Sequence, residues 1–216
     1  RTGRLIAVEV DKVLAERLRE TYAGHSGVTV VVEDARELDI DAAVPDGSTY
    51  KVVANLPYYA ASPIVRRFLE CSLPPSIMAV TVQREVAQSM TASQGKMRIL
   101  SVATQLYGKP RIMGYVQPGS FRPPPKVTSA IVRIEVFDKP ALSLDDTNAF
   151  FQVVRAGFSS ARKQLRNSLD NSLGVSGAQM EEILEESEVD PRLRAEALGL
   201  EDWKRIYDAF RSRGLC

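Results

Sequence analysis

The sequence predicts an α/β protein, in which a doubly wound sheet is followed by a small α-helical domain. Over residues 1–139, short apolar runs alternate with helical patterns, as strands alternate with crossover helices in a parallel sheet. The first run is continuously apolar and β-rich, which is typical of a strand covered on both faces. Residues 140–216 contain helical patterns and no strand-like run. We therefore expect two domains, residues 1–139 and 140–216.

Each element of the first domain has a local signal. Asp11 follows the first apolar run and is placed to cap a helix that carries Val13, Leu14 and Leu18 on one side. A turn at residues 45–47 precedes the third run. The expected strands are residues 5–10, 28–32, 50–54, 77–82, 112–116 and 130–136. The later helices of this domain are expected at residues 63–71, 85–91 and 97–107.

The connection between the last two expected strands differs from the others. Residues 118–126 are rich in glycine and proline, so they are too irregular for the crossover helix that joins parallel strands. We therefore expect the sheet to be antiparallel at this end.

The composition excludes several classes of protein. A net charge of +1 means that any nucleic-acid binding must come from local clusters of charge. Two cysteines and one histidine supply neither a disulfide framework nor a usual zinc site. No apolar run approaches the roughly 20 residues that span a bilayer. We expect no metal, no membrane association and a cytoplasmic location.

Polar side chains close the first three expected strands, namely Glu9, Asp34 and Asn55. Ligands of open parallel sheets bind beyond the carboxyl ends of the strands, where an acid commonly holds a ribose. A second acid is suited to accept a hydrogen bond from an adenine amino group. Either acid taken alone is better explained as a helix cap. Together the three residues indicate a nucleoside site, in which NAD and S-adenosylmethionine remain alternatives.

The segment Asn55-Leu56-Pro57-Tyr58 favours methyl transfer to an aromatic amine. The Asn55 side chain and the carbonyl of Leu56 or Pro57 are suited to accept hydrogen bonds from such an amine, while Pro57 stiffens the turn. Tyr58 offers an aromatic face to the base. Catalysis of this kind rests mainly on positioning. The alternative is a strand that ends in an Asn-Pro turn with a core tyrosine.

A second aromatic residue, Phe121, lies in the proline-rich segment that follows the fifth expected strand. Enzymes that modify a base hold it between apolar or aromatic groups after removing it from its stack. Tyr58 and Phe121 are the expected pair of walls, and Arg122 and Lys126 are expected to meet phosphates. Without the other motifs, a loop anchored by a buried phenylalanine would explain this segment.

Four segments carry motifs: Asn55–Tyr58 with Ser62-Pro63, VQREV at 82–86, FRPPPKV at 121–127 with Ser129-Ala130, and RKQLRNSL at 162–169. Together they resemble the KsgA-type ribosomal RNA adenine dimethyltransferases, from Leu5 to about Arg211. The resemblance implies a Rossmann-like methyltransferase sheet and an enzyme of ribosome biogenesis. Its implied reaction is S-adenosylmethionine-dependent N6,N6-dimethylation of two adjacent adenosines near the 3′ end of small-subunit ribosomal RNA.

The resemblance also implies roles for individual residues. Glu9 would hold the cofactor ribose, Asp34 and Ala35 its adenine, and Asn55 would lie beside both the cofactor and the target amine. Two departures stand out: Tyr59-Ala60 replaces an amide and a branched aliphatic residue, and the family's glycine-rich cofactor loop with the strand before it is absent.

The absent loop leads to an expectation about the chain itself. We expect the natural protein to start at least about 30 residues earlier, the size of one βα unit. The first strand of the sheet would then be missing, and this chain would bind no S-adenosylmethionine by itself. Its sheet should be gapped or re-paired between the strands that end at Glu9 and Asn55.

Basic residues gather in the helical domain. Arg155, Arg162 and Arg166 are spaced by seven and four, as on one helical face, with Lys163 beside them. No acid occurs between residues 155 and 166, whereas residues 181–190 contain six. The basic group is expected to contact RNA phosphates and the acidic stretch to point away; a solvated face is the alternative.

Two other functions are weighed against this one. A catalytically inactive RNA-binding or ribosome-assembly module would keep the fold. The missing glycine loop favours it, whereas the intact Asn55–Tyr58 segment and Phe121 argue against it. A nucleotide-dependent oxidoreductase is disfavoured by the Asn-Leu-Pro-Tyr turn. The expected partner is the small ribosomal subunit, and the expected state is a monomer.

Overall fold

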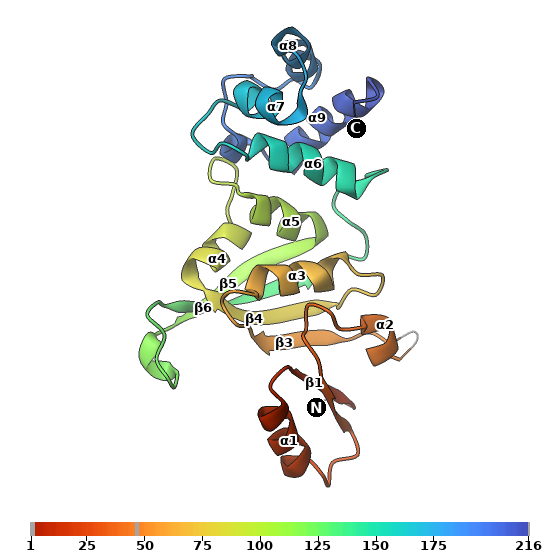
Figure 1. The fold of residues 1–216 in the computed structure, drawn as a ribbon, viewed down its shortest axis with the longest axis vertical. Helices are drawn as coiled ribbons and strands as arrows, with labels where there is room; N and C mark the ends of the chain where they lie inside the picture. The colour runs from red at the N-terminus through yellow and green to blue at the C-terminus, as the bar shows by residue number, and fades with distance from the viewer. Residues whose placement is uncertain (1–2, 46–47, 216) are drawn as a thin grey trace.

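The computed structural model describes residues 3–45 and 48–215, so the expected turn at 45–47 lies partly outside the described residues. The molecule is elongated (Figure 1). A small N-terminal unit lies at one end, a four-stranded sheet with its helices lies in the middle, and the C-terminal helices lie at the other end.

The N-terminal unit is a strand-helix-strand motif made of β1 (Leu5–Glu9), α1 (Lys12–Thr21) and β2 (Val28–Val32). The two strands pair in parallel from Leu5 opposite Val28 to Glu9 opposite Val32. Asp11 caps α1 as expected, because its carboxylate accepts hydrogen bonds from the backbone N–H groups of Val13 and Leu14.

The middle sheet has the strand order β3-β4-β6-β5. Its strands are β3 (Lys51–Asn55), β4 (Ile77–Gln83), β5 (Gly108–Val116) and β6 (Ser129–Val136). β3 and β4 are parallel, whereas β6 runs antiparallel to both β4 and β5. The expected antiparallel end is therefore confirmed.

Strand β5 begins earlier than the expected residue 112, because Gly108 to Arg111 also pair with β6. Pro110 is tolerated there since β5 lies at the edge of the sheet. At Gly108, a Cβ atom would lie 2.7 Å from the Glu135 carbonyl oxygen, so only glycine fits against β6. The sequence did not predict residues 108–111 as strand, because glycine and proline are unfavourable in strands.

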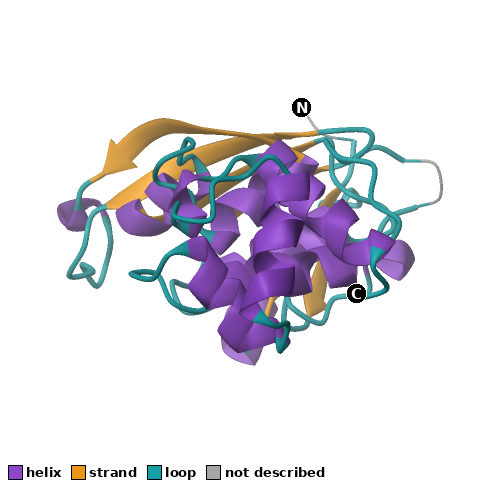
Figure 2. Cartoon of the chain, turned by 90° about the horizontal axis from the view of Figure 1, so that it is seen from above, coloured by secondary structure: helices purple, strands orange, loops and turns teal. Residues whose placement is uncertain are grey.

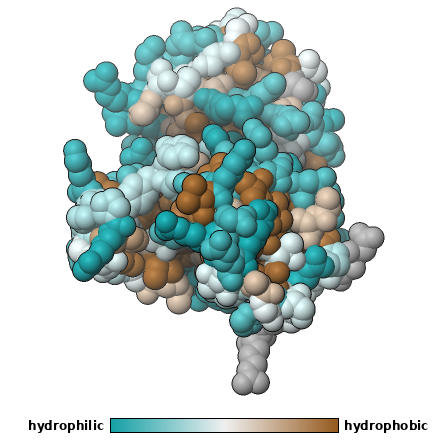
Figure 3. Space-filling view, turned by 60° about the horizontal axis from the view of Figure 1, so that its bottom comes forward, coloured by the Kyte–Doolittle hydropathy of each residue, from teal (hydrophilic) through white to brown (hydrophobic). Residues whose placement is uncertain are grey.

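The sheet is divided between the strands that end at Glu9 and Asn55. β1 and β2 form a separate two-stranded sheet, and β3 pairs with β4 alone. Of the two outcomes expected from the resemblance, a gapped or a re-paired sheet, the structure has the gapped one. Val53 on β3 is 83% exposed and Val13 on α1 is 63% exposed. Figure 3 views the molecule from this end, where apolar residues lie at the surface between polar ones.

Helices cover one face of the four-stranded sheet, as Figure 2 shows in side view. They are α2 (Ile40–Ala43), α3 (Ala61–Glu70), α4 (Arg84–Met90) and α5 (Ile99–Tyr107). Exposure alternates along β3 and β4, because only one side of each strand meets these helices. The first strand, β1, was expected to be covered on both faces; this is wrong, because Leu5 is exposed and the other residues of β1 are only partly buried. The short helix α2 was not expected either.

The C-terminal region is helical throughout, as expected. It contains α6 (Thr147–Gly157), α7 (Leu165–Leu173), α8 (Gly177–Glu186) and α9 (Leu200–Ser212). Their shared core includes Trp203, Tyr207, Phe150 and Phe210. Three residues of α5 (Val102, Ala103 and Leu106) belong to the same core. The boundary at residue 139 stays a prediction, and α5 joins the regions on either side of it.

Candidate active site

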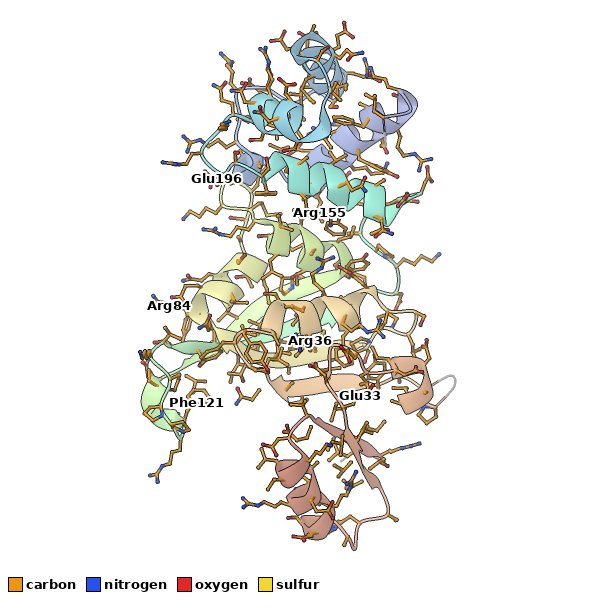
Figure 4. All side chains as sticks on the ribbon, in the orientation of Figure 1. Glu33, Arg36, Arg84, Phe121, Arg155 and Glu196 are labelled. Atoms are coloured by element: carbon orange, nitrogen blue, oxygen red, sulfur yellow. The ribbon has the colours of Figure 1, made fainter. Side chains whose placement is uncertain are left out.

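A cavity of about 270 Å³ lies where the end of β3 meets the loop between β5 and β6. We call it the aromatic pocket. It brings Tyr58 and Phe121 to one place although they lie far apart in the sequence, and Phe121 is labelled on its loop in Figure 4. Its lining residues are Asn55, Leu56, Tyr58, Phe121, Arg122, Pro123 and Pro125.

The turn at one side of the pocket is held by backbone hydrogen bonds. The Leu56 N–H donates to the Thr81 carbonyl of β4 at 3.2 Å, and the Leu56 side chain is buried. The Ala60 N–H donates to the Pro57 carbonyl at 3.0 Å. Asn55 is exposed at the end of β3 and is one of the residues that line the pocket. Because the backbone of the turn is held, an accessible polar side chain at this position is suited to position a ligand.

The Tyr58 ring is half-buried and its hydroxyl oxygen lies 2.7 Å from the Ser129 hydroxyl oxygen. Ser129 is fully buried at the start of β6. Tyr58 is therefore attached to the sheet at the far end of its ring, with the ring on the pocket wall.

The opposite wall belongs to the connection between β5 and β6. A short 3-10 helix, η1 (Pro118–Ser120), precedes Phe121, whose N–H donates to the Pro118 carbonyl at 3.1 Å. The loop rejoins the sheet at Thr128, whose carbonyl accepts a hydrogen bond from the Arg84 N–H at 3.0 Å. Arg122 lines the pocket, and Lys126 is exposed on the same loop. The loop therefore contributes Phe121, Arg122, Pro123 and Pro125 to the pocket lining.

The acids expected to hold a nucleoside lie at the ends of β1 and β2. Glu9 accepts a hydrogen bond from the Asp11 N–H on its Oε1 atom at 2.9 Å. Asp34 forms a fork with Arg36, whose Nη2 atom lies 2.6 Å from Oδ2. This pairing lowers the pKa of Asp34 to about 2, first through the side-chain hydrogen bonds of Arg36 and then through its backbone N–H. Neither acid lines the aromatic pocket.

Similarity to known proteins decides what kind of site this is. Residues 1–211 match the family described as "Ribosomal RNA adenine dimethylase". The chain belongs to this family. Its members are methyltransferases.

Two bacterial relatives illustrate the match within the dimethylase family. A "Ribosomal RNA small subunit methyltransferase A" of Dehalococcoides mccartyi is 38% identical over 206 residues, covering 95% of this chain and 71% of its own length. The protein of the same name from Pelotomaculum thermopropionicum is 38% identical over 226 residues, covering 99% and 77%.

Two solved structures resemble the fold. The 23S rRNA methyltransferase ErmE superposes with a TM-score of 0.70 at 25% identity, covering 98% of this chain and 83% of its own. A dimethyladenosine transferase from Plasmodium falciparum superposes with a TM-score of 0.79 at 21% identity, with the same coverage. The Rossmann-like methyltransferase fold is thereby confirmed.

The dimethylase family implies S-adenosylmethionine as methyl donor, and the described residues fit part of that molecule. Glu9 has two acceptor oxygens and uses one for the Asp11 N–H, so it keeps acceptor capacity for a ribose hydroxyl, and Ala35 packs against the sheet core beside Asp34. Asp34 accepts hydrogen bonds from both the backbone N–H and the guanidinium of Arg36. To bind Asp34, an adenine amino group would have to displace the Arg36 guanidinium from one of the carboxylate oxygens.

The basic residues of the helical region do not share one helical face, contrary to expectation. α6 ends at Gly157 and α7 begins at Leu165, so Arg162 and Lys163 lie on the segment between two helices. Arg155 is exposed on α6, where Figure 4 labels it. Arg166 forms an ion pair with Glu181 of α8. The acidic stretch therefore does not point away as a whole, because one of its members neutralises a predicted RNA contact.

Two absences are part of the site description. Within residues 3–45 and 48–215, no three histidine, cysteine or acidic side chains are gathered as a metal site would need. Over the same described ranges, no helix has the length and apolar character to cross a membrane.

Ser129 and Arg36 contact predicted site residues, yet sequence reasoning gave them no role. Ser129 had a usable signal: it is a polar residue at the start of a buried apolar strand, where a hydroxyl needs a partner. Arg36 follows Asp34 at a spacing that allows a local fork. The sequence alone does not distinguish that fork from an exposed arginine.

Proposed function

We propose that the protein transfers methyl groups from S-adenosylmethionine to the N6 atoms of two adjacent adenosines near the 3′ end of small-subunit ribosomal RNA. The observation that carries this proposal is the aromatic pocket, which gathers Asn55, Tyr58 and Phe121 around one cavity. The names of the bacterial relatives support the small subunit as the substrate.

In the proposed mechanism, the target adenine leaves its stack and enters the pocket between Tyr58 and Phe121. Its amino group donates hydrogen bonds to the Asn55 side-chain carbonyl and to the Leu56 backbone carbonyl. The Pro57 carbonyl is the alternative acceptor; it already accepts one hydrogen bond from the Ala60 N–H and has a second lone pair. Both acceptors draw the nitrogen lone pair out of the ring, so that it faces the methyl donor. The bound cofactor supplies an activated methyl group on sulfur.

Cofactor binding is proposed to need a further strand between β1 and β3. Each of these strands has one edge without a pairing partner, so a strand between them would supply the missing backbone hydrogen bonds. Glu9 and Asp34 lie on one side of this gap and Asn55 lies on the other. We propose that residues 1–216 alone do not bind S-adenosylmethionine tightly. Calorimetry tests this, and stoichiometric tight binding to this chain would contradict it.

The RNA is proposed to run from the pocket to the helical region. Arg122 and Lys126 are the proposed phosphate contacts at the pocket, and Arg155, Arg162 and Lys163 are those at the helical end. All five side chains are exposed. A contact from Arg166 would first have to break its ion pair with Glu181. We further propose that the protein acts in the cytoplasm as a monomer.

A labelled-methyl assay tests the proposed function. The gene's full product, with any residues before Arg1 or after Cys216, is incubated with labelled S-adenosylmethionine and isolated small or large ribosomal subunits. Label is expected in adenosines of the small-subunit RNA only. Label in the large subunit would assign the reaction to the substrate class of ErmE, and RNA binding without label would indicate an inactive assembly module.

A further inference from the structure

We propose that Ser129 is a positioning residue that fixes the spacing between the two aromatic walls of the pocket. The inference deepens the proposed function and rests on it, because it assigns a role to a side chain that touches neither base nor cofactor. Ser129 is fully buried, and its hydroxyl oxygen lies 2.7 Å from that of Tyr58.

The backbone of Ser129 is held from both sides. It pairs with Gln83 of β4 and with Val116 of β5, so the residue lies between two strands of the sheet. A hydroxyl attached to such a backbone has little freedom. It therefore serves as a rigid point of attachment for the Tyr58 ring.

The same point ends the loop that carries Phe121. Ser129 is the first residue of β6, and the preceding Thr128 carbonyl is held by the Arg84 N–H. Val116, the residue that ends β5, pairs with Ser129 across the base of the loop. Two consecutive residues therefore hold both aromatic walls: Thr128 holds the end of the loop that carries Phe121, and Ser129 holds the hydroxyl of Tyr58.

The hydrogen bond restrains the tyrosine ring where a base would stack. A tyrosine turns about two side-chain torsions, and a contact at its hydroxyl restricts the first, χ1, which sets where the ring lies. The second torsion turns the ring about an axis that passes through the hydroxyl oxygen, so the contact does not hold it. The bond also gives a partner to a buried serine hydroxyl, which would otherwise be costly to bury. The pocket therefore keeps its width before any substrate arrives, which is the condition for catalysis by positioning.

Two variants remove this hydrogen bond from opposite ends. In the gene's full product, Ser129→Ala and Tyr58→Phe are each expected to lower kcat for small-subunit methylation by about three- to tenfold, the range for one hydrogen bond. The KM for RNA should change by less than about twofold, because phosphate contacts dominate RNA affinity. The double variant should be no slower than the slower single variant.

Ser187→Ala is the matched control. It also deletes a buried serine hydroxyl, but one that donates to the Ile183 carbonyl in the C-terminal helices. Its kcat should equal that of the wild type. Full kcat in both site variants, or reductions in kcat that multiply in the double variant, would overturn the proposal.

A second measurement separates this inference from the proposed function. In protein with ¹³C-labelled tyrosine, Ser129→Ala should shift the Tyr58 ring resonances, which Tyr58→Phe identifies by removing them. Unshifted resonances would overturn the attachment of the ring whatever the activity. A wild type that methylates no RNA would refute the proposed function, and the resonances would still decide whether Ser129 holds Tyr58.

Discussion

At the scale of single residues, the aromatic pocket depends on groups that are fixed by their neighbours. Asn55 ends a strand, Leu56 is bonded to β4 and Tyr58 is bonded to β6. Among these, Asn55 is the side chain proposed to meet the reacting nitrogen. Its removal should therefore affect the transition state more than the bound ground state.

Asn55→Ala in the gene's full product is expected to lower the single-turnover rate of methyl transfer by about a hundredfold, as for removal of one preorganised polar group. Affinity for S-adenosylmethionine should fall by a smaller factor, which equilibrium binding measures. Asn148→Ala, on the exposed first turn of α6, is the matched control with unchanged rate. A near wild-type rate for Asn55→Ala would remove Asn55 from the mechanism.

Arg36→Ala should release the Asp34 carboxylate. The pKa of Asp34 is expected to rise from about 2 toward its ordinary 3.8, because the side-chain hydrogen bonds of Arg36 are the main cause of the shift. A lowered pKa in the folded state stabilises the protein above about pH 4, and this contribution disappears as pH falls through 2. The variant should lack that pH dependence. NMR titration of the carboxyl carbon measures the change, and a pKa still near 2 would exclude Arg36 as its cause.

At the scale of elements, the connection between α6 and α7 places basic side chains outside any helix. Arg162 and Lys163 are exposed there, and the Lys163 N–H donates to the Ser160 carbonyl in a local turn. Arg166, in the first turn of α7, is engaged by Glu181 instead. The sequence spacing therefore groups Arg162 and Lys163, which are exposed, with Arg166, which forms an ion pair.

Arg162→Gln combined with Lys163→Gln should weaken binding to small ribosomal subunits and flatten its salt dependence. The slope of log affinity against log salt should fall by roughly two units, about one for each phosphate that the variant no longer neutralises. Arg192→Gln, an exposed arginine paired with Asp190, is the matched control. An unchanged slope in the double variant would leave the connection as a solvated surface.

At the scale of the whole molecule, the N-terminal unit is packed much less than the rest. Among described residues 3–37, Ala15 alone is buried, whereas the four-stranded sheet contributes Met78, Val80 and Val132 at 0% exposure. Apolar burial is the main source of local stability. The N-terminal unit should therefore open before the sheet does.

Hydrogen exchange of this 216-residue chain tests that order. Backbone amides of β1 and β2 are expected to exchange faster than those of β4 and β6, through local opening that leaves the sheet intact. The C-terminal helices, with Trp203 and Phe210 fully buried, should exchange as slowly as the sheet. Equal protection in β1 and β4 would mean that the divided sheet unfolds as one unit.

Much of this architecture is predictable from sequence, because its signals are local. Asp11 as a helix cap, the apolar strands and the antiparallel end all follow from residue type and spacing. The gap between β1 and β3 was predictable only through the resemblance to a known family. Ion pairs such as Asp34–Arg36 and Arg166–Glu181 were not predictable, since they depend on side-chain geometry and on the approach of separate helices.

Helix α5 connects the two parts of the molecule that are proposed to contact RNA. Its Leu106 lies in the core of the C-terminal helices, while its Leu100 and Tyr107 pack against the core of the sheet. Just before α5, the Gly95 and Met97 N–H groups both donate to the Glu196 carbonyl (Figure 4). The sheet that carries the pocket and the C-terminal helices are therefore joined by packed side chains and backbone hydrogen bonds as well as by the chain itself. If RNA contacts both parts as proposed, the distance between them is a further constraint on which adenosine reaches the pocket.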